Sequence, residues 1–178
     1  MESFEILDRE KVNTSELVIK KSKFLGFVYY VESKEIAEKY VQEVQDKFKD
    51  ARHVVYAYRL KSTGKFTDDK EPQGTAGKPI YSLIEKENLI NVLIVVVRYF
   101  GGILLGAGPL TRAYATCAKE ALAKCEKVQY KEYIEKEVVC NYNEEEINCR
   151  NLKNANCIIQ NIERTDKVKI TYLEPKED

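Results

Sequence analysis

VLIVVVRYFGGILLGAGPLTRAY, residues 92–114, decides how this chain folds. Its first six residues, Val92 to Val97, are apolar and mostly β-branched, which is typical of a strand buried on both faces. Glycines follow, and a helical pattern then runs from Pro109 to about Cys125. Proline suits the first helical position because its φ is fixed and it has no N–H. We therefore predict a buried strand, a glycine-rich loop and a helix, in that order.

The glycine-rich loop is a candidate anion site. The first turn of a helix has unpaired N–H groups and carries about half a positive charge, and glycines let a backbone approach a ligand. Arg98 and Arg112 flank the loop and are suited to phosphate. Two alternatives stay open: glycines that serve packing alone, or an arginine that pairs with an acidic side chain such as Asp68 or Glu71. The stretch matches neither the Walker pattern nor G-x-G-x-x-G, so it specifies no nucleotide.

A length of 178 residues allows one medium-sized domain, or one domain with a small second one. The 29 basic and 29 acidic side chains cancel, so net charge does not indicate nucleic-acid binding. No apolar run is long enough to span a membrane, and the N-terminal MESFEILDREK is acidic where a signal peptide is basic. The five cysteines form no C-x-x-C pair, which indicates neither a disulfide framework nor a zinc site. We expect a cytoplasmic protein with no membrane partner, metal or cofactor, and the oligomeric state is left open.

Periodicity and turn residues predict the remaining elements of the first domain, residues 1–127. They are a hairpin of 15–20 and 23–31, a helix capped by Ser33 that ends near Lys49, a strand at 53–60, a loop at 61–79 and a short helix at 80–86. A loop of that length inside a domain is uncommon and often functional.

The chain changes in character after the helix that ends near Cys125, and residues 128–178 are predicted to form a second, small domain. Its expected elements are a strand at 133–142, a helix capped by Asn143 with glutamates in its first turn, and a hairpin of 157–163 and 168–173. A β-α-β-β segment of this size is marginal as a free domain.

Two polar clusters are candidates for chemistry. His53, the single histidine, follows Arg52 at the start of a predicted strand, and Asp68, Asp69 and Glu71 form an acidic group in the predicted loop. Together they could act as an acid–base pair or ligate a divalent metal. The simpler interpretation is a histidine bonded to a backbone carbonyl and carboxylates in solvent. Since these segments and the glycine-rich loop all flank strand ends, we expect them to meet at one edge of the sheet.

Four segments resemble the signature segments of the IMPACT/YigZ family. They are KSKF (21–24), ARHVVYAYRL (51–60), DDKEPQGTAGKPI (68–80) and VVVRYFGGILLGAGPLTRAY (95–114). Their order matches that of the family across most of residues 15–125. Two positions depart from the family pattern, which has glycine where this chain has Lys70 and Pro109. The first departure leaves the turn in the acidic loop unexplained, and the second stiffens the start of the helix.

The resemblance implies an α+β first domain like the second domain of ribosomal protein S5 and domain IV of elongation factor G, with a left-handed β-α-β connection. It implies a second, ferredoxin-like domain similar to domain V of elongation factor G, here truncated by the loss of a final helix and strand. Eukaryotic relatives modulate the kinase that senses amino-acid starvation. We expect this chain to lack their additional N-terminal partner-binding domain. No enzymatic activity is securely attached to the bacterial members.

The residues and the resemblance together indicate a translation-associated regulatory protein, rather than an enzyme, that binds RNA or another phosphate-bearing ligand. The residues expected to contact that ligand are Arg52, Thr75, Lys78, Arg98, Tyr99, Gly101, Gly102, Gly106, Gly108 and Arg112. Tyr99 or Phe100 would stack on a base. Arginine is rarely buried, so Arg98 and Arg112 are expected outside the core.

Two alternatives to the RNA-binding interpretation remain. One is a regulator that binds a partner protein, such as a ribosome-associated factor, without nucleic acid. The other is a hydrolase that uses His53 with the cluster of Asp68, Asp69 and Glu71.

Overall fold

The computed structural model describes residues 4–7 and 12–176 and divides the chain into two compact units, Met1–Tyr130 and Lys131–Asp178. Most of the N-terminal segment from which we predicted the absence of a signal peptide, residues 1–11, lies outside the described residues. No helix in the described ranges has the length and apolar character needed to cross a membrane.

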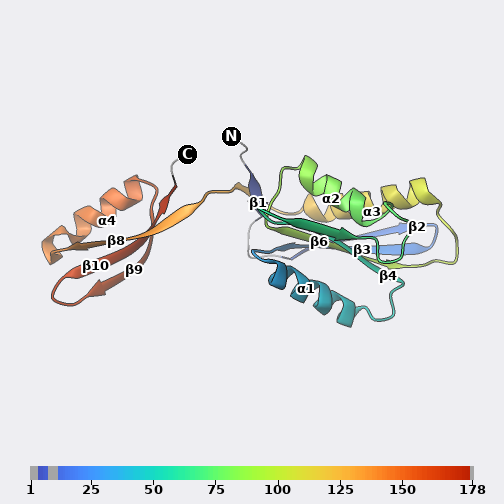
Figure 1. The fold of residues 1–178 in the computed structure, drawn as a ribbon, viewed down its shortest axis with the longest axis horizontal. Coiled ribbons are helices and arrows are strands. Elements are labelled where there is room, and N and C mark those ends of the chain that lie inside the picture. The colour runs from blue at the N-terminus through green and yellow to red at the C-terminus, as the bar shows by residue number, and fades with distance from the viewer. Residues whose placement is uncertain (1–3, 8–11, 177–178) are drawn as a thin grey trace. The chain divides into compact units, whose positions relative to one another are not determined.

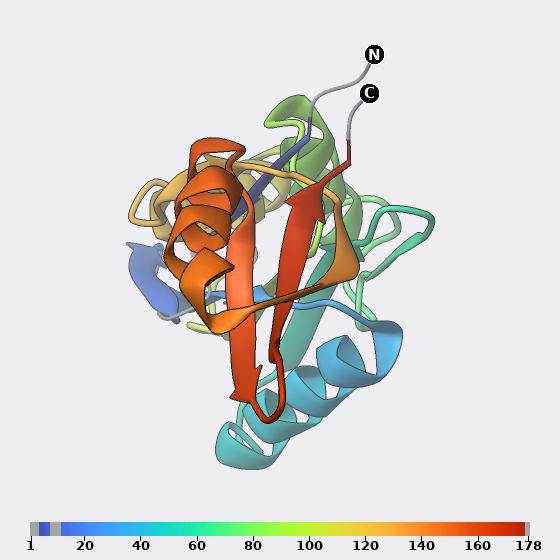
Figure 2. The same ribbon diagram turned by 90° about the vertical axis from the view of Figure 1, so that its left-hand side faces the viewer.

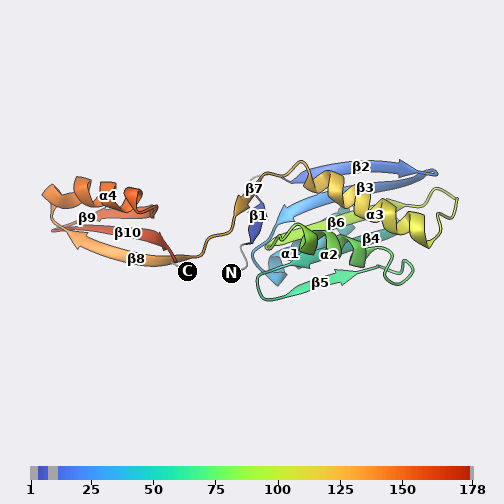
Figure 3. The same cartoon turned by 90° about the horizontal axis from the view of Figure 1, so that it is seen from above.

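The first unit is built on a five-stranded antiparallel sheet around the predicted buried strand (Figure 3). The strand order is β2 (Asn13–Ile19), β3 (Ser22–Tyr30), β6 (Val92–Tyr99), β4 (His53–Arg59) and β5 (Gly64–Thr67). Because β3 and β4 both pair antiparallel with β6, they run parallel to each other. The chain passes from β3 to β4 through helix α1 (Lys34–Lys47).

Helices cover both faces of this sheet (Figure 1). Helices α2 (Gly77–Lys86) and α3 (Ala107–Leu122) pack on one face, in a core that includes Val96, and α1 packs on the other, in a core that includes Val97. Successive β6 side chains thus enter different cores, which explains the uninterrupted apolar run and confirms the prediction of a strand buried on both faces.

A small ribbon joins the two ends of the first unit. Strand β1 (Glu5–Leu7) pairs antiparallel with β7 (Lys127–Gln129), and Leu7 is buried in the core beneath α2 and α3. Because of this pairing, β7 belongs to the first unit.

The second unit has the predicted β-α-β-β order (Figures 1 and 2). Its elements are β8 (Tyr133–Cys140), the short 3₁₀ helix η1 (Tyr142–Glu144), α4 (Glu145–Asn154), β9 (Ile158–Arg164) and β10 (Val168–Pro175). The sheet has the order β8-β10-β9, and its small core is centred on Cys140, Val168 and Ile170.

Three local predictions were wrong. The predicted loop at 61–79 contains strand β5. Helix α2 begins at Gly77, three residues before the predicted start at Ile80, because the Asp68 carboxylate accepts the N–H groups of Ala76 and Gly77. The cap of the helical segment in the second unit is Asn141 instead of Asn143, in a capping box with Glu144. Helix α3 begins at Ala107, so Pro109 lies within the first turn, where its missing N–H is still tolerated.

The close contact between α3 and β3 generates a first test. A Cβ added to Gly26 would lie 2.4 Å from Ser15 Oγ and 3.1 Å from the Cys117 carbonyl oxygen, two atoms that are already hydrogen-bonded to each other at 2.6 Å. We expect Gly26→Ala to lower the free energy of unfolding in urea by about 1–3 kcal/mol. Gly108→Ala is the control, since its added Cβ meets nothing closer than 3.5 Å. Equal stability of the two variants would contradict this packing.

Candidate functional site

Three side chains form a row across the sheet at the end where β6 leads into the glycine-rich loop. The β-ladder places Arg98 of β6 between Phe24 of β3 and His53 of β4. Alternate residues of a strand face the same side, so Arg98 lies on the same face of the sheet as Val96, which α2 and α3 cover. Phe24 and His53 pair directly with Arg98 and therefore lie on that face as well. Arg98 is 5% exposed, so the expectation that it lies outside the core is wrong.

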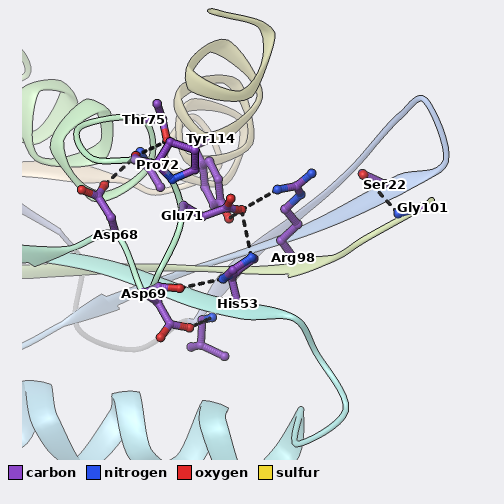
Figure 4. A network of polar contacts seen from close by, with 12 residues as sticks. Ser22, His53, Asp68, Asp69, Glu71, Pro72, Thr75, Arg98, Gly101 and Tyr114 are labelled. Carbon is purple, nitrogen blue, oxygen red and sulfur yellow. Dashed lines mark hydrogen bonds and ion pairs between the residues drawn. The ribbon is translucent and has the colours of Figure 1, made fainter. Parts of the chain in front are cut away.

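Arg98 is buried because a carboxylate meets it. Its Nη1 donates to Glu71 Oε1 at 2.6 Å, and the hydroxyl of Tyr114 in α3 donates to the same oxygen at 2.7 Å (Figure 4). Glu71 itself is 8% exposed. A buried charge requires a partner and hydrogen bonds, and this arrangement provides both. The alternative in which Arg98 pairs with Glu71 is therefore the one observed.

Burial and hydrogen bonding also fix the protonation state of Tyr114. Burial, and then the hydrogen bond to Glu71, raise the pKa of the Tyr114 hydroxyl far above its usual value. The phenol consequently stays a neutral donor to the carboxylate at physiological pH.

His53 links this ion pair to the acidic loop. Its Nδ1 lies 2.6 Å from the backbone carbonyl oxygen of Asp69, and its Nε2 lies 3.7 Å from Glu71 Oε1. A carbonyl only accepts, so Nδ1 carries the proton and Nε2 faces Glu71. This is the backbone-bonded histidine of the simpler interpretation.

The carboxylates of Asp68 and Asp69 hold the backbone of the acidic loop. Asp68 accepts the N–H groups of Gly74, Ala76 and Gly77 at 2.8, 3.1 and 2.8 Å, which fixes the start of α2. Asp69 Oδ2 accepts the Val54 N–H at 2.6 Å. With Glu71 bound to Arg98, each of the three carboxylates has a structural partner. Within residues 4–7 and 12–176 no group of three His, Cys, Asp or Glu side chains is placed to hold a metal.

The turn in this loop forms with lysine where the family pattern has glycine. Asp69 and Lys70 both adopt positive φ, 42° and 64°. Lysine in this left-handed region is strained, because Cβ crowds the backbone. Glycine, which the resemblance led us to expect at this position, adopts that conformation without strain.

The glycine-rich loop, residues 100–106, uses its glycines in two ways. Gly102 and Gly106 have φ of 82° and 81°, which glycine adopts without strain. Gly101 has no room for a side chain, because an added Cβ would lie 2.1 Å from the carbonyl carbon of Lys21. Its N–H donates to Ser22 Oγ at 3.2 Å. The β2–β3 turn therefore lies directly against the start of the loop.

Apolar side chains of the same loop face solvent. Phe100 is 46% exposed, Ile103 43% and Leu104 84%. The guanidinium of Arg98 lies over two rings, with Cζ 5.6 Å from the Phe24 centroid and 5.8 Å from that of Phe100. The Nε of Arg98 is buried without a hydrogen-bond partner among the described residues.

The other residues expected to contact phosphate fall into two groups. Arg52, Lys78 and Arg112 are exposed, whereas Thr75 is buried and its hydroxyl donates to the carbonyl oxygen of Pro72. Tyr99 packs with the α1 core on the opposite face of the sheet and donates to Asp50. The structure therefore brings together His53, Glu71 and Arg98, but not Tyr99.

Sequence reasoning missed Tyr114, Phe24 and Ser22 as parts of this site. Tyr114 was detectable, because it is four residues from Leu110 and three from Cys117 on the buried face of α3. The Ser22 contact depends on the approach of the β2–β3 turn to Gly101, which no local pattern reveals.

Comparison with known proteins places these features in one family. The model of the Impact N-terminal domain matches residues 20–122. The IMPACT family member YvyE of Bacillus subtilis is 39% identical over 110 residues, covering 60% of this chain and 51% of that protein. The IMPACT family member YigZ of Escherichia coli is 34% identical over 131 residues, covering 71% and 64%. The chain thus spans between half and two thirds of these curated relatives.

A solved structure matches nearly the whole chain. It is a crystal structure described as that of a hypothetical protein, 30% identical, with a TM-score of 0.72 over 98% of this chain and 86% of that one.

The buried ion pair generates a test of stability. Arg98→Met leaves the Glu71 carboxylate buried without its cation, which should lower the free energy of unfolding by about 3–5 kcal/mol. Adding Glu71→Gln should recover part of this loss, because the buried charge is removed. Arg112→Ala, at an exposed position, should change stability by no more than about 0.5 kcal/mol. Urea denaturation measures all four proteins, and equal losses for Arg98→Met and Arg112→Ala would contradict the buried pair.

The strained turn generates a second test. Lys70→Gly should raise the free energy of unfolding by up to about 1 kcal/mol, because the strain of about 1–2 kcal/mol is partly offset by the greater entropy of glycine in the unfolded chain. Lys78→Gly in the first turn of α2 is the control and should lower stability by up to about 1 kcal/mol. Thermal melts measure both changes, and a destabilised Lys70→Gly protein would show that the lysine side chain makes a needed contact.

Proposed function

Because this chain belongs to the Impact N-terminal domain family, we propose that it is a translation-associated regulatory protein that binds RNA. The binding surface is the end of the five-stranded sheet where β6 leads into the glycine-rich loop. The translational role rests on the family resemblance, and the RNA-binding role rests on the charges at this end of the sheet.

The distribution of charge carries the proposal. The acidic side chains Asp68, Asp69 and Glu71 are engaged by backbone N–H groups or by Arg98. Several exposed cations at this end or beside the acidic loop have no ion pair in the described part of the chain. They are Lys20, Lys21, Arg52, Lys70, Lys78 and Arg112. A chain with no net charge therefore presents a surface that attracts phosphate.

The backbone contributes to the same surface. Three of the exposed cations are placed at this surface by their contacts. The Arg52 backbone N–H donates to the Arg98 carbonyl oxygen at 3.0 Å, and the Lys21 backbone lies against Gly101. A side-chain nitrogen of Arg112 lies 3.5 Å from where a Cβ on Gly108 would be. No side chain caps α3 and its first turn has no acidic residue, so its N-terminal N–H groups suit a phosphate oxygen. The role of Arg98 in this proposal is to hold the loop, since it is buried against Glu71.

The fold proposed from the family resemblance fits this role. The first unit corresponds to the second domain of ribosomal protein S5 and domain IV of elongation factor G, and the second unit to a truncated ferredoxin-like domain. The parallel strands β3 and β4 on either side of β6, and the β-α-β-β order of the second unit, support these assignments. The five free cysteines are consistent with action in the cytoplasm.

A second candidate function has one observation in its favour. Leu104 is 84% exposed at the tip of the loop, beside Ile103, and exposed apolar side chains of this kind are typical of protein contacts. In that case the chain is a regulator that binds a partner protein at the loop without nucleic acid.

Salt dependence separates the two functions. We expect the affinity of the full chain for a single-stranded RNA to fall with salt, with a slope of roughly −0.7 per phosphate contact. Arg112→Ala should weaken binding by about 1–3 kcal/mol and reduce the slope by one contact, with an unchanged melting temperature. Lys39→Ala, on α1 at the opposite face, is the control and should bind as the wild type does. Undetectable or salt-independent binding would refute the RNA-binding function and favour the protein partner.

A further inference from the structure

An aromatic and cationic stack ends at the surface beside the glycine-rich loop. Tyr114 packs its edge on Phe24, with centroids 5.2 Å apart and planes at 89°. The Arg98 guanidinium lies over Phe24, and Phe100 forms the last layer over the same guanidinium. Phe100 is 46% exposed, and the one ring contact that the described residues give it is Arg98. The stack therefore lacks a layer on its outer side.

We propose that Phe100 is a stacking platform for an unpaired base, and that the ligand of this surface is single-stranded RNA. This inference rests on the proposed function. It adds that the RNA is single-stranded and that Phe100 is the side chain that stacks on its unpaired base. Base stacking on an aromatic side chain suits single strands, because every base presents a π-face once it is unpaired.

The residues on either side of Phe100 are held by contacts within the protein. Arg98, on its inner side, is fixed by the 2.6 Å contact with Glu71. The next residue, Gly101, donates to Ser22 Oγ and lies against the Lys21 backbone. A platform whose neighbours on both sides are held in place loses less conformational entropy on binding than a side chain on a free loop.

The inner cation also selects what the outer face accepts. A guanidinium over one face of a ring uses the negative potential of the π-system. That face of the ring is already occupied by a cation, so the exposed face is left for a neutral planar group such as a base. Stacked bases inside an A-form duplex cannot reach the ring, and the deep groove of such a duplex excludes side chains.

The backbone close to Phe100 has one open position. A Cβ added at Gly102 would meet no atom within 4 Å, so one side of the backbone is open at the second residue after Phe100, although Gly101 itself is packed against Lys21. Three exposed cations have contacts along this segment: Lys21 at Gly101, Arg52 at the Arg98 carbonyl and Arg112 at Gly108. They would contact the phosphates on either side of the stacked base.

The test compares three labelled ten-nucleotide probes with the full chain by fluorescence anisotropy. The probes are an unstructured adenine-rich RNA, the same backbone with abasic sugars, and an RNA duplex of equal length. We expect the wild type to bind the single strand roughly 5- to 100-fold more tightly than the abasic strand. Phe100→Leu should remove this difference without changing the salt slope, and Phe100→Tyr should retain it. Leu104→Ala is the control for an apolar contact from the same loop and should have no effect.

Each other outcome identifies which proposal fails. If the wild type binds the single strand and the abasic strand equally, with a salt-dependent affinity, stacking is overturned and the proposed function stands. If Leu104→Ala lowers the affinity as much as Phe100→Leu does, the loop makes a general apolar contact and stacking is again overturned. If no probe binds at low salt, the proposed function fails together with this inference. Melting temperatures of the variants confirm that each one is folded.

Discussion

The carboxylate of Glu71 is the contact on which the rest of this end of the molecule depends. It comes from the loop before α2, and it receives Arg98 from β6 and Tyr114 from α3. Three segments that are distant in the sequence therefore meet at one oxygen. Since an unpaired charge in this environment is very unfavourable, the three segments keep their positions together. Arg98 is the last residue of β6 on the face that α2 and α3 cover. Its position therefore also fixes where Phe100 and the glycine-rich loop leave the sheet.

The side chains that most resemble catalytic groups in the sequence have structural roles here. Asp68 caps α2, Asp69 holds the start of β4, and His53 bonds to a backbone carbonyl. The polar groups left for a ligand are exposed cations and the backbone of a glycine-rich loop. An electrically neutral chain thus presents exposed cations at this end, because Asp68, Asp69 and Glu71 are engaged by backbone N–H groups or by Arg98, whereas Lys21, Arg52 and Arg112 are exposed.

The family match and the site lie in the same unit. The matched residues, 20–122, end with α3, and the second unit begins at Lys131. Every residue used in the site belongs to the first unit. The second unit, with its small core and largely exposed strand β8, contributes no residue to the argument about RNA.

The sequence by itself determined the framework of the protein. The apolar run from Val92 to Val97 predicted the central strand, and periodicity with turn residues predicted α1, the strand at 53–60 and the β-α-β-β order of the second unit. These elements could be predicted because apolar periodicity depends on residues that are neighbours along the chain. The alternation of a strand also separates Arg98 from Tyr99, although we predicted both for one ligand.

Only the tertiary structure decided the roles of the polar residues. Whether Arg98 faces solvent or a carboxylate depends on where Glu71, 27 residues earlier, is placed. Whether Asp68 is a catalytic group or a helix cap depends on the path of the backbone that returns to it at Gly77. Sequence patterns record which residues are buried, whereas the partner of a buried charge is set by contacts between segments that no local period connects.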